Sequence, residues 1–350
     1  MSVPAGQGDG RGIVNSGTPT VIARARELVE PALRAAINGL DPHMAVVSAY
    51  QLGWVDTEGA PTPGGGGKAI RPTLAVVSAE SVGAEARVGV PAAAAVELVH
   101  NFSLLHDDVM DRDVERRHRP TGWKVFGEGQ AILGGSAMMT RAIEVLVADG
   151  EAGARALPVL LRAVQALIRG QSADLRFEQA EVISLTDCID MEAGKTAALL
   201  ECAASIGAVA AGAPAATVRA LAGYGFELGV AFQLVDDVLG IDGDPLVTGK
   251  SASSDLRAGK RSAPVVAALN SDTPAAQRLA KLLAGGPPAT ECDVLDAKDA
   301  VIEAGGLDWA NAEAQRRFDA GLAHLDAVEL DSAARVQLVE LAEYVVKRNR

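Results

Sequence analysis

The sequence predicts an all-α protein, and three observations support this fold class. Alanine, leucine, valine and glutamate recur at helical spacing along most of the 350 residues. Alternating runs of β-branched residues are scarce, and aromatic residues make up only 3% of the chain. Apolar residues account for 49% of the composition, which is enough to form a sizeable core. We therefore expect one large helical domain.

The N-terminal part of the chain is expected to contain a leader, one helix and a loop. Residues 1–19 are polar and rich in glycine, so we expect a disordered leader there and a folded domain over residues 20–350. The first amphipathic pattern begins near Thr20. Glycine and proline predominate in the segment 56–67, which predicts a loop.

Helical patterns then follow one another to the end of the sequence. They resume after Pro72 and at Pro91, where proline suits the first turn of a helix, and the helix from Pro91 is expected to end near Asp111. The segment 284–291 is expected to form a surface loop. The remaining helices are predicted near residues 130–149, 152–177, 189–211, 214–240, 262–270, 273–284, 292–305, 308–326 and 331–348.

Charge, termini and cysteine usage exclude several classes of protein. The formal net charge of -13 argues against a nucleic-acid partner, because a phosphate-backbone binder normally carries a basic face. The N-terminus lacks the apolar core of a signal peptide, and no stretch predicts stable membrane insertion. Cys188, Cys202 and Cys292 have no metal-type spacing, which suits buried thiols in a reducing compartment. We expect a soluble, cytoplasmic protein.

The most informative feature of the sequence is a pair of aspartates that occurs twice. The first pair, Asp107 and Asp108, closes an apolar helical run, and Asp111 lies four residues after Asp107 on the same helix face. Arg116 and Arg117 follow. Carboxylate oxygens are the ligands that magnesium prefers, and arginines bind phosphate or diphosphate. This segment therefore predicts a site for magnesium and diphosphate.

The second pair, Asp236 and Asp237, lies 129 positions after the first and closes another apolar run. Gln233 is three residues before Asp236, so it stands beside the pair on the helix, and Lys250 follows the pair. A single pair of this kind is more often a solvated helix end. Two copies that both lead into basic residues favour a shared metal and diphosphate site.

Other basic residues and histidines give weaker signals. Lys68 and Arg71 follow a glycine-rich segment and could close over an anion, although an ordinary solvated loop is an equal alternative. The glycines near Lys68 and Lys195 do not have the spacing of a nucleotide-binding P-loop. His100 lies on the same helical stripe as Asp107, where it could donate to an anion or serve as a core histidine.

In order and spacing these motifs resemble those of the trans-isoprenyl diphosphate synthases (the polyprenyl synthetase family), especially the actinobacterial geranylgeranyl diphosphate synthases. The likeness spans roughly residues 20–350. The matching positions are Gly67-Lys68-Ala69-Ile70-Arg71-Pro72, His100, Asp107-Asp108-Val109-Met110-Asp111, Arg116-Arg117, Lys195-Thr196, Phe232-Gln233, Asp236-Asp237, Lys250 and Lys260.

The resemblance implies the isoprenoid synthase fold, which is an all-α bundle around a central cavity, and a homodimer. It also implies an enzyme that condenses isopentenyl diphosphate with an allylic diphosphate (dimethylallyl, geranyl or farnesyl diphosphate). Three magnesium ions would join the two acid clusters to the allylic diphosphate. The implied metal ligands are Asp107, Asp108, Asp111 and Asp236, and the implied catalytic set also includes Asp237 and Lys195.

The substrate-binding residues that the resemblance implies are divided between two diphosphates. This division agrees with the chemistry, because one diphosphate leaves and must have its developing charge stabilised, whereas the other only has to be held. On the allylic side the residues are Arg116, Lys195, Thr196, Gln233, Lys250 and Lys260. On the isopentenyl side they are Lys68, Arg71, His100 and Arg117.

One position departs from the family pattern. Gly240 stands where the second acid cluster of the family frequently has a last aspartate. We expect activity to be retained because Asp236 is present, and we expect Asp242 or Asp244 to compensate for the missing carboxylate.

Product length is expected to depend on Phe102 and Ser103, which lie about one turn before Asp107. By the resemblance, large aromatic residues at both positions give a C15 pocket, whereas an aromatic residue followed by a small one leaves room for C20. The expected product is therefore geranylgeranyl diphosphate, with farnesyl diphosphate as the alternative.

Two further functions share this fold. A class I terpene cyclase has the first acid motif, but it usually carries a different second metal motif and does not need Lys68, Arg71 and Arg117. An inactive regulatory subunit would tend to lose acidic or basic site residues, and here both sets are essentially complete. As a reference position we expect charge reversal at Asp331, taken to be exposed, to leave turnover almost unchanged.

Overall fold

The all-α prediction is confirmed by the structure. The computed structural model describes residues 19–62, 67–177, 180, 182–243 and 253–347. Within these ranges the strands are two short segments, β1 (Glu115–Arg116) and β2 (Arg119–Pro120), which pair antiparallel in a small hairpin. Of the expected leader, only Pro19 lies within the described residues, and Lys250 and Asp244 lie outside them.

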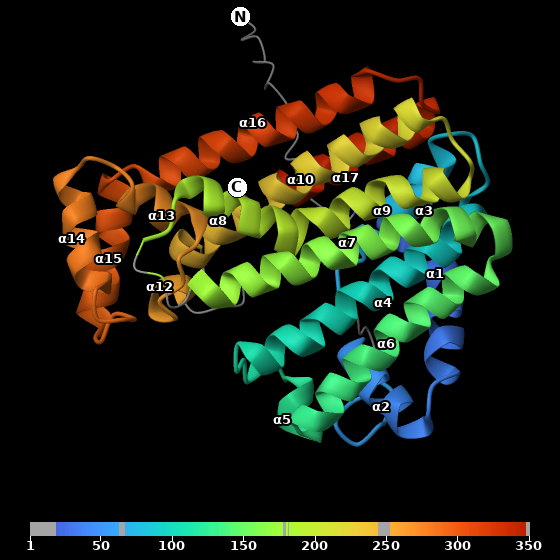
Figure 1. Ribbon diagram of the computed structural model, residues 1–350, viewed down its shortest axis with the longest axis horizontal. Helices are drawn as coiled ribbons and strands as arrows, with labels where there is room; N and C mark the ends of the chain where they lie inside the picture. The colour runs from blue at the N-terminus through green and yellow to red at the C-terminus, as the bar shows by residue number, and fades with distance from the viewer. Residues whose placement is uncertain (1–18, 63–66, 178–179, 181, 244–252, 348–350) are drawn as a thin grey trace, which may run out of the picture.

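The helices follow one another with short connections (Figure 1). In chain order they are α1 (Thr20–Asn38), α2 (Pro42–Gln51), α3 (Ile70–Glu80), α4 (Ala86–Met110), α5 (Gly122–Phe126), α6 (Glu128–Ala148), α7 (Gly150–Phe177), α8 (Leu185–Glu192), the π-helical turn η1 (Ala193–Ala197), α9 (Ala198–Ala210), α10 (Ala215–Asp242), α12 (Ser254–Arg257), α13 (Ala263–Leu269), α14 (Pro274–Leu283), α15 (Glu291–Glu303), α16 (Gly306–Asp326) and α17 (Ser332–Lys347).

The predicted start of a helix at Pro91 was wrong. Helix α4 begins at Ala86, and Pro91 lies inside it. A proline in a helix interior removes one backbone hydrogen bond, so the extra turn needs another source of stability. Close packing on α3 supplies it, because a Cβ added at Gly89 would lie only 2.8 Å from the carbonyl oxygen of Ala75.

Small residues let the central helices approach one another closely. A Cβ added at Gly207 on α9 would lie 2.0 Å from the Ala75 oxygen on α3, and one added at Gly225 on α10 would lie 2.5 Å from the Leu200 oxygen on α9. Helices α4, α7 and α10 all run towards the side of the bundle where α12 lies (Figure 1). The ends of α4 and α10, which carry the two acid clusters, therefore point the same way.

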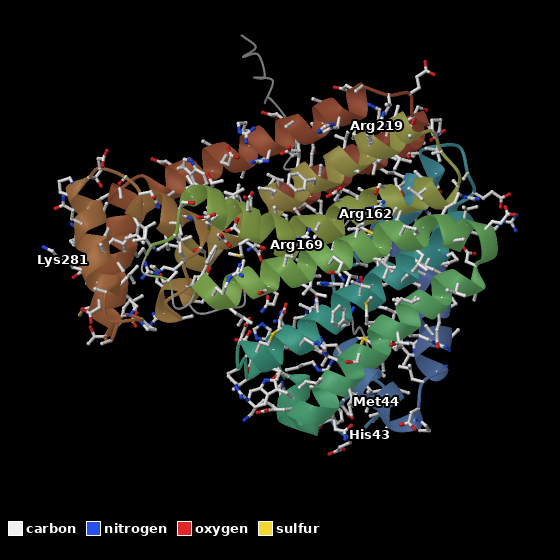
Figure 2. All side chains as sticks on the ribbon, viewed as in Figure 1. His43, Met44, Arg162, Arg169, Arg219 and Lys281 are labelled. Atoms are coloured by element: carbon white, nitrogen blue, oxygen red, sulfur yellow. The ribbon has the colours of Figure 1, made fainter. Side chains whose placement is uncertain are left out.

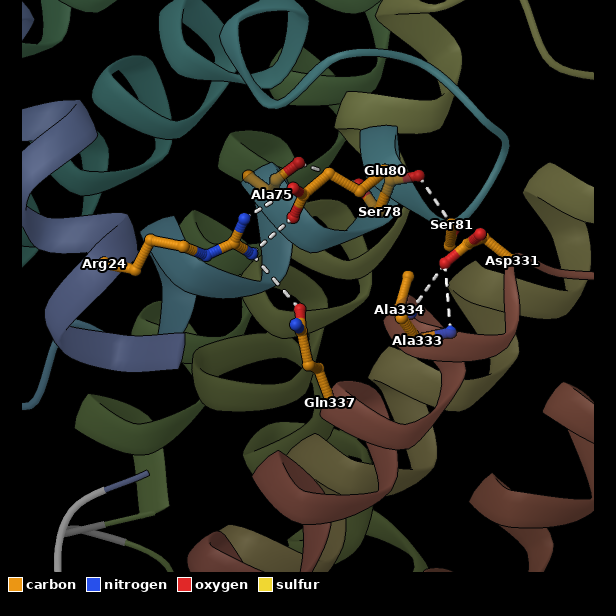
Figure 3. Close-up of polar contacts among 9 residues, drawn as sticks. All are labelled: Arg24, Ala75, Ser78, Glu80, Ser81, Asp331, Ala333, Ala334 and Gln337. Atoms are coloured by element: carbon orange, nitrogen blue, oxygen red, sulfur yellow. Dashed lines mark hydrogen bonds and ion pairs between the residues drawn. The ribbon is translucent and has the colours of Figure 1, made fainter. Parts of the chain in front are cut away.

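A polar network joins the first helices to the last one (Figure 3). Both terminal nitrogens of Arg24 on α1 donate to Glu80 on α3 at 2.6 Å, and one of them also donates to Gln337 on α17. The side chain of Asp331 accepts from the first backbone N–H groups of α17, and its own N–H donates to the Ser81 oxygen. Asp331 is therefore a helix cap, so charge reversal there should lower the stability of the protein, while the expectation of unchanged turnover stays a prediction.

Three helical segments are long and apolar enough to span a membrane by length and composition, namely Ala86–Met110, Glu128–Ala148 and Leu185–Ala210. The sequence interpretation had found no such segment. In the first and third segments most of the apolar window is buried inside the bundle, at 72% and 67% respectively. In the second segment, which is α6, only 33% is buried.

Candidate active site

The first acid cluster forms where α4 ends. Asp108 is 1% exposed, and its Oδ1 accepts from Nε and Nη2 of Arg116, both at 2.7 Å. Its Oδ2 is buried and has no hydrogen-bond partner among the described residues. Asp107 and Asp111, in contrast, are partly exposed. Adjacent residues on a helix point in different directions, so the pair divides between the protein interior and the site.

Burial raises the pKa of Asp107 to about 6, while the charge of Lys195 opposes this rise and that of Asp111 adds to it. Burial also raises the pKa of Asp111, and here both Lys195 and Lys260 oppose the rise. Lysines from two distant parts of the chain thus both act on Asp111. The structure brings these four residues together, and their roles in binding metal and diphosphate stay predictions.

Lys195 reaches this place through a break in helical geometry. It lies in η1, a π-helical turn between α8 and α9, and such turns often occur at functional sites. The turn packs on α7 through two glycines, since a Cβ added at Gly170 would lie 2.2 Å from the backbone nitrogen of Lys195 and 2.6 Å from the carbonyl carbon of Gly194. The Lys195 ammonium forms an ion pair with Asp174 of α7.

The second acid cluster lies on α10 and forms a chain of hydrogen bonds. Thr196 Oγ1 donates to Gln233 Oε1 at 2.7 Å, and Gln233 Nε2 donates to Asp237 Oδ1 at 2.8 Å. The other oxygen of Asp237 accepts from the backbone N–H of Ala263 at 3.0 Å. Asp237 is 5% exposed and both of its oxygens are used inside the protein, whereas Asp236 is partly exposed.

A buried acid supports this second cluster from behind. Glu192 on α8 is 4% exposed, and burial together with the charge of Asp237 raises its pKa well above the ordinary value. The thiol of Cys188, whose pKa is raised by burial, donates to Glu192 at 3.7 Å. A protonated Glu192 can donate to Asp237 and thereby keep a single negative charge in this pair.

Cations gather at a separate place beside the middle of α4. Nη1 of Arg71 lies 3.5 Å from Nε2 of His100. Burial lowers the pKa of Arg71 to about 10, with Glu97 opposing and Arg117 adding to the shift. Burial and the charges of Arg71 and Arg117 lower the pKa of His100 well below its usual value, so this imidazole is neutral near pH 7.

The hairpin and the glycine segment complete this cation group. Arg117 lies in the β1–β2 turn with φ 54°, a left-handed conformation that few non-glycine residues adopt. A Cβ added at Gly67 would lie 2.9 Å from the Arg117 guanidinium, so the glycine backbone and this guanidinium are close neighbours. The Gly67 oxygen accepts from Arg26 of α1 at 2.6 Å, and Lys68 beside it is exposed.

Sequence reasoning missed four residues of these groups. Glu97 lies among the cations and accepts from Asn101 at 3.1 Å, and Arg26 and Asp174 form the contacts described above. Gln171 is 5% exposed, and neither atom of its amide has a hydrogen-bond partner among the described residues. The sequence does place Gln171 and Asp174 three positions apart, on one face of α7 and next to the interior Gly170. This spacing is the signal that could have identified them.

The side chains expected to set product length are both buried beneath the first acid cluster. Phe102 is 8% exposed and meets the ring of His106 edge-on at 5.1 Å between centroids. Ser103 is 6% exposed, and its hydroxyl donates to the His100 oxygen at 2.9 Å. The short side chain of Ser103 therefore folds back on its own helix.

The donors fit magnesium in kind. Among the described residues no three acidic, histidine or cysteine side chains form a ready-made metal site. Magnesium is usually bound by one or two carboxylates plus substrate phosphates, and not by a cage made only of protein. The partly exposed Asp107, Asp111 and Asp236 and the orphaned oxygen of Asp108 are suitable hard donors for that arrangement.

Comparisons with known proteins identify the family that the chain resembles. The family model described as polyprenyl synthetase matches residues 60–301. A (2E,6E)-farnesyl diphosphate synthase of Mycobacterium tuberculosis is 45% identical, covering 95% of this chain and 93% of its own. A geranylgeranyl diphosphate synthase of the same organism is 41% identical, covering 94% and 93%. The crystal structure of a polyprenyl synthetase from Streptomyces coelicolor superposes with a TM-score of 0.91 at 47% identity, covering 94% of this chain and 100% of that one.

Proposed function

The chain belongs to the polyprenyl synthetase family and is a trans-prenyltransferase, and from this premise we propose that it makes geranylgeranyl diphosphate. The reaction joins isopentenyl diphosphate to an allylic diphosphate and releases diphosphate. The observation that carries the C20 assignment is the pair Phe102 and Ser103, since Ser103, one turn before Asp107, is a small residue where the family's C15 pockets carry a second aromatic one. The 45% identity to a farnesyl diphosphate synthase favours C15 as the second candidate.

Product analysis tests this assignment. The purified protein is incubated with isopentenyl diphosphate and each of the three allylic diphosphates, and the products are identified by mass spectrometry. A dominant C20 diphosphate supports the proposal, and Ser103→Phe should then shorten the product towards C15. Ser103→Ala serves as the matched control, because it keeps the small volume. A dominant C15 product of the wild type would favour the farnesyl alternative.

We propose that the two acid clusters hold three magnesium ions and the allylic diphosphate between them. Bound magnesium would neutralise the charge that develops on the leaving diphosphate. Asp107, Asp111 and Asp236 would hold these ions, together with the partnerless Oδ2 of Asp108. Asp108 would also position Arg116 through its other oxygen, and Asp237 would position Gln233. The residues proposed to bind the allylic diphosphate are Arg116, Lys195, Thr196, Gln233, Lys250 and Lys260.

The cation group beside α4 is proposed to hold isopentenyl diphosphate through Lys68, Arg71, His100 and Arg117. Glu97 keeps this group from being purely repulsive, because its charge raises the pKa of Arg71. Arg71→Ala should therefore raise the KM for isopentenyl diphosphate more than the KM for the allylic substrate. Equal effects on both KM values would contradict this division of the site.

We also propose a soluble, cytoplasmic homodimer in which a second copy covers α6. Ile132, Leu133 and Val147 of this helix are 45%, 56% and 64% exposed, and the helix is the least buried of the three long apolar segments. Leu133→Glu should shift the protein from dimer to monomer in sedimentation velocity, whereas Val336→Glu on α17, at 53% exposure, should not. A wild-type monomer would contradict the proposal.

The same core supports one polyprenyl synthetase domain over residues 20–350. Helix α10 contributes to all three apolar clusters, with Leu221 in the first, Val230 in the third and Ile241 in the second.

Diphosphate release separates the proposed enzyme from the two other functions that share this fold. The synthase needs isopentenyl diphosphate for release, a terpene cyclase does not, and an inactive subunit releases none.

A further inference from the structure

The space beside Gly240 is occupied by a carboxylate from another helix. Gly240 lies four residues after Asp236, so the two positions share one face of α10. A Cβ added at Gly240 would lie 2.3 Å from Oδ2 and 2.5 Å from Cγ of Asp255. These distances are far shorter than a van der Waals contact. A side chain at position 240 and the present position of the Asp255 carboxylate therefore exclude each other.

Several contacts hold Asp255 against the end of α10. Ser253, which is 3% exposed, donates from its hydroxyl to the Ile241 oxygen at 2.9 Å. Leu256 is 1% exposed and belongs to the same apolar cluster as Ile241. The Asp255 side chain lies between these two anchored neighbours and is itself partly exposed. These neighbours keep residue 255 beside the end of α10, and in this structure its carboxylate turns towards Gly240.

The same turn also reaches the first acid cluster. The backbone N–H of Lys260 donates to the Asp255 carbonyl oxygen at 2.9 Å. The charge of Lys260 opposes the rise that burial causes in the pKa of Asp111. The short segment from Asp255 to Lys260 thus presents a carboxylate towards one cluster and an ammonium towards the other.

Asp242, which the sequence suggested as the compensating carboxylate, is already paired with another residue. The carboxylate of Asp242 forms an ion pair with Lys298 of α15 at 2.5 Å. Its charge is therefore already matched by a cation that belongs to α15. Asp244 lies outside the described residues. Asp255 is the carboxylate whose position coincides with the gap at Gly240.

We propose that Asp255 supplies the carboxylate that Gly240 lacks, so that the second acid cluster consists of Asp236 and Asp255 from two different helices. This inference rests on the proposed function. Asp255 adds its negative charge to the magnesium ion that Asp236 would hold, either as a ligand or through the water that magnesium retains. Asp255 is then the source of the charge that an aspartate at position 240 would supply.

Manganese titration provides a readout that does not depend on turnover. Electron paramagnetic resonance counts free Mn²⁺ during its titration into protein that contains inorganic diphosphate. Asp255→Asn should weaken the weakest bound Mn²⁺ roughly tenfold, the size expected for loss of a supporting carboxylate. The matched control is Asp296→Asn, an exposed acid on the neighbouring helix α15, which should leave the titration unchanged. Thermal unfolding checks that each variant is folded.

A relocation experiment makes the inference sharper. Asp255→Ser combined with Gly240→Asp keeps one carboxylate in the same space, so this double variant should regain most of the affinity that Asp255→Ser alone loses. If Asp255→Asn proves unstable, this pair of variants decides the question. An unchanged titration for Asp255→Asn, or no recovery in the double variant, overturns the inference.

Asp236→Asn separates this inference from the proposed function. If Asp236→Asn weakens Mn²⁺ binding and Asp255→Asn does not, only the role of Asp255 is wrong. If neither variant weakens it, the metal site proposed at the second cluster is wrong as well.

Discussion

The two acid clusters are alike in sequence, but the protein holds them differently. In the first, Asp108 receives the guanidinium of Arg116 on one oxygen and leaves the other without a partner among the described residues. In the second, both oxygens of Asp237 are used, by the neutral amide of Gln233 and the backbone of Ala263. Asp108 of the first pair thus binds a cation, whereas Asp237 of the second pair binds an amide and a backbone N–H.

This difference indicates that the two aspartates of each pair have different roles. In both pairs the second aspartate binds the protein and the first is partly exposed. The first pair also has Asp111 one turn later, whereas the second pair has Gly240. The first cluster draws its three carboxylates from the end of one helix, whereas in the proposal above the second adds Asp255 from α12.

The largest expected effect tests the exposed members of both pairs. Asp107→Ala or Asp236→Ala should lower kcat by orders of magnitude, because a metal ligand acts mainly when charge develops. Steady-state diphosphate release measures this. Lys281→Ala is the control, since this lysine projects from α14 at the edge of the molecule (Figure 2). Turnover near the wild-type value in either aspartate variant would contradict the metal assignment.

Stability should distinguish the two members of the second pair. Asp237→Ala leaves the Ala263 N–H and the Gln233 amide without their acceptor in a buried place, which should cost about 1–3 kcal/mol for an unsatisfied group. Asp236→Ala, at a partly exposed position, should change the free energy of unfolding less. Urea unfolding measures both variants. A larger loss for Asp236→Ala would reverse the proposed division.

Protonation of the first cluster should move stability and metal affinity in opposite directions. The pKa of Asp107 in the folded protein is about 6, which is above the ordinary value of 3.8, so the folded state binds more protons between these two pH values. The free energy of unfolding contributed by Asp107 therefore falls as pH rises through this window. Metal affinity rises over the same window, because the ligand must be ionised.

Asp107→Asn checks this prediction. Urea unfolding at about pH 5 and about pH 7 should show a smaller pH dependence of stability in this variant than in the wild type. Mn²⁺ titration at the same two pH values should likewise show a smaller pH dependence of metal affinity. Asp296→Asn, on the exposed surface of α15, should keep the wild-type dependence. The same dependence in Asp107→Asn would assign the titration to another group.

The smallest expected effect lies outside both clusters. Asp331→Lys removes the cap of α17, and the loss of such a cap costs about 1 kcal/mol. Thermal unfolding should therefore detect it, while kcat and both KM values should stay unchanged. The conservative Asp331→Asn, which retains an acceptor oxygen, should lose less stability. A change in KM would link this end of the bundle to the site.

Much of the fold and of the site could be predicted from local patterns. Helical periodicity located most of the long helices, and the spacing of Asp107 and Asp111 placed them on one face of α4. Local patterns missed the break at η1, the first turn of α4 before Pro91 and the short helix α12. These features depend on packing between distant segments. No local pattern marks Asp255 as a neighbour of Gly240.

The sequence by itself determined the fold class, the two acid clusters and the family to which they belong. Periodicity and spacing are local properties, so they can be read without knowing how the helices pack. Only the tertiary structure decided which aspartate of each pair turns inward, that Asp242 binds Lys298, and that Asp255 fills the space at Gly240. These outcomes depend on partners far away in the chain, because burial and pairing are set by the neighbours that packing supplies.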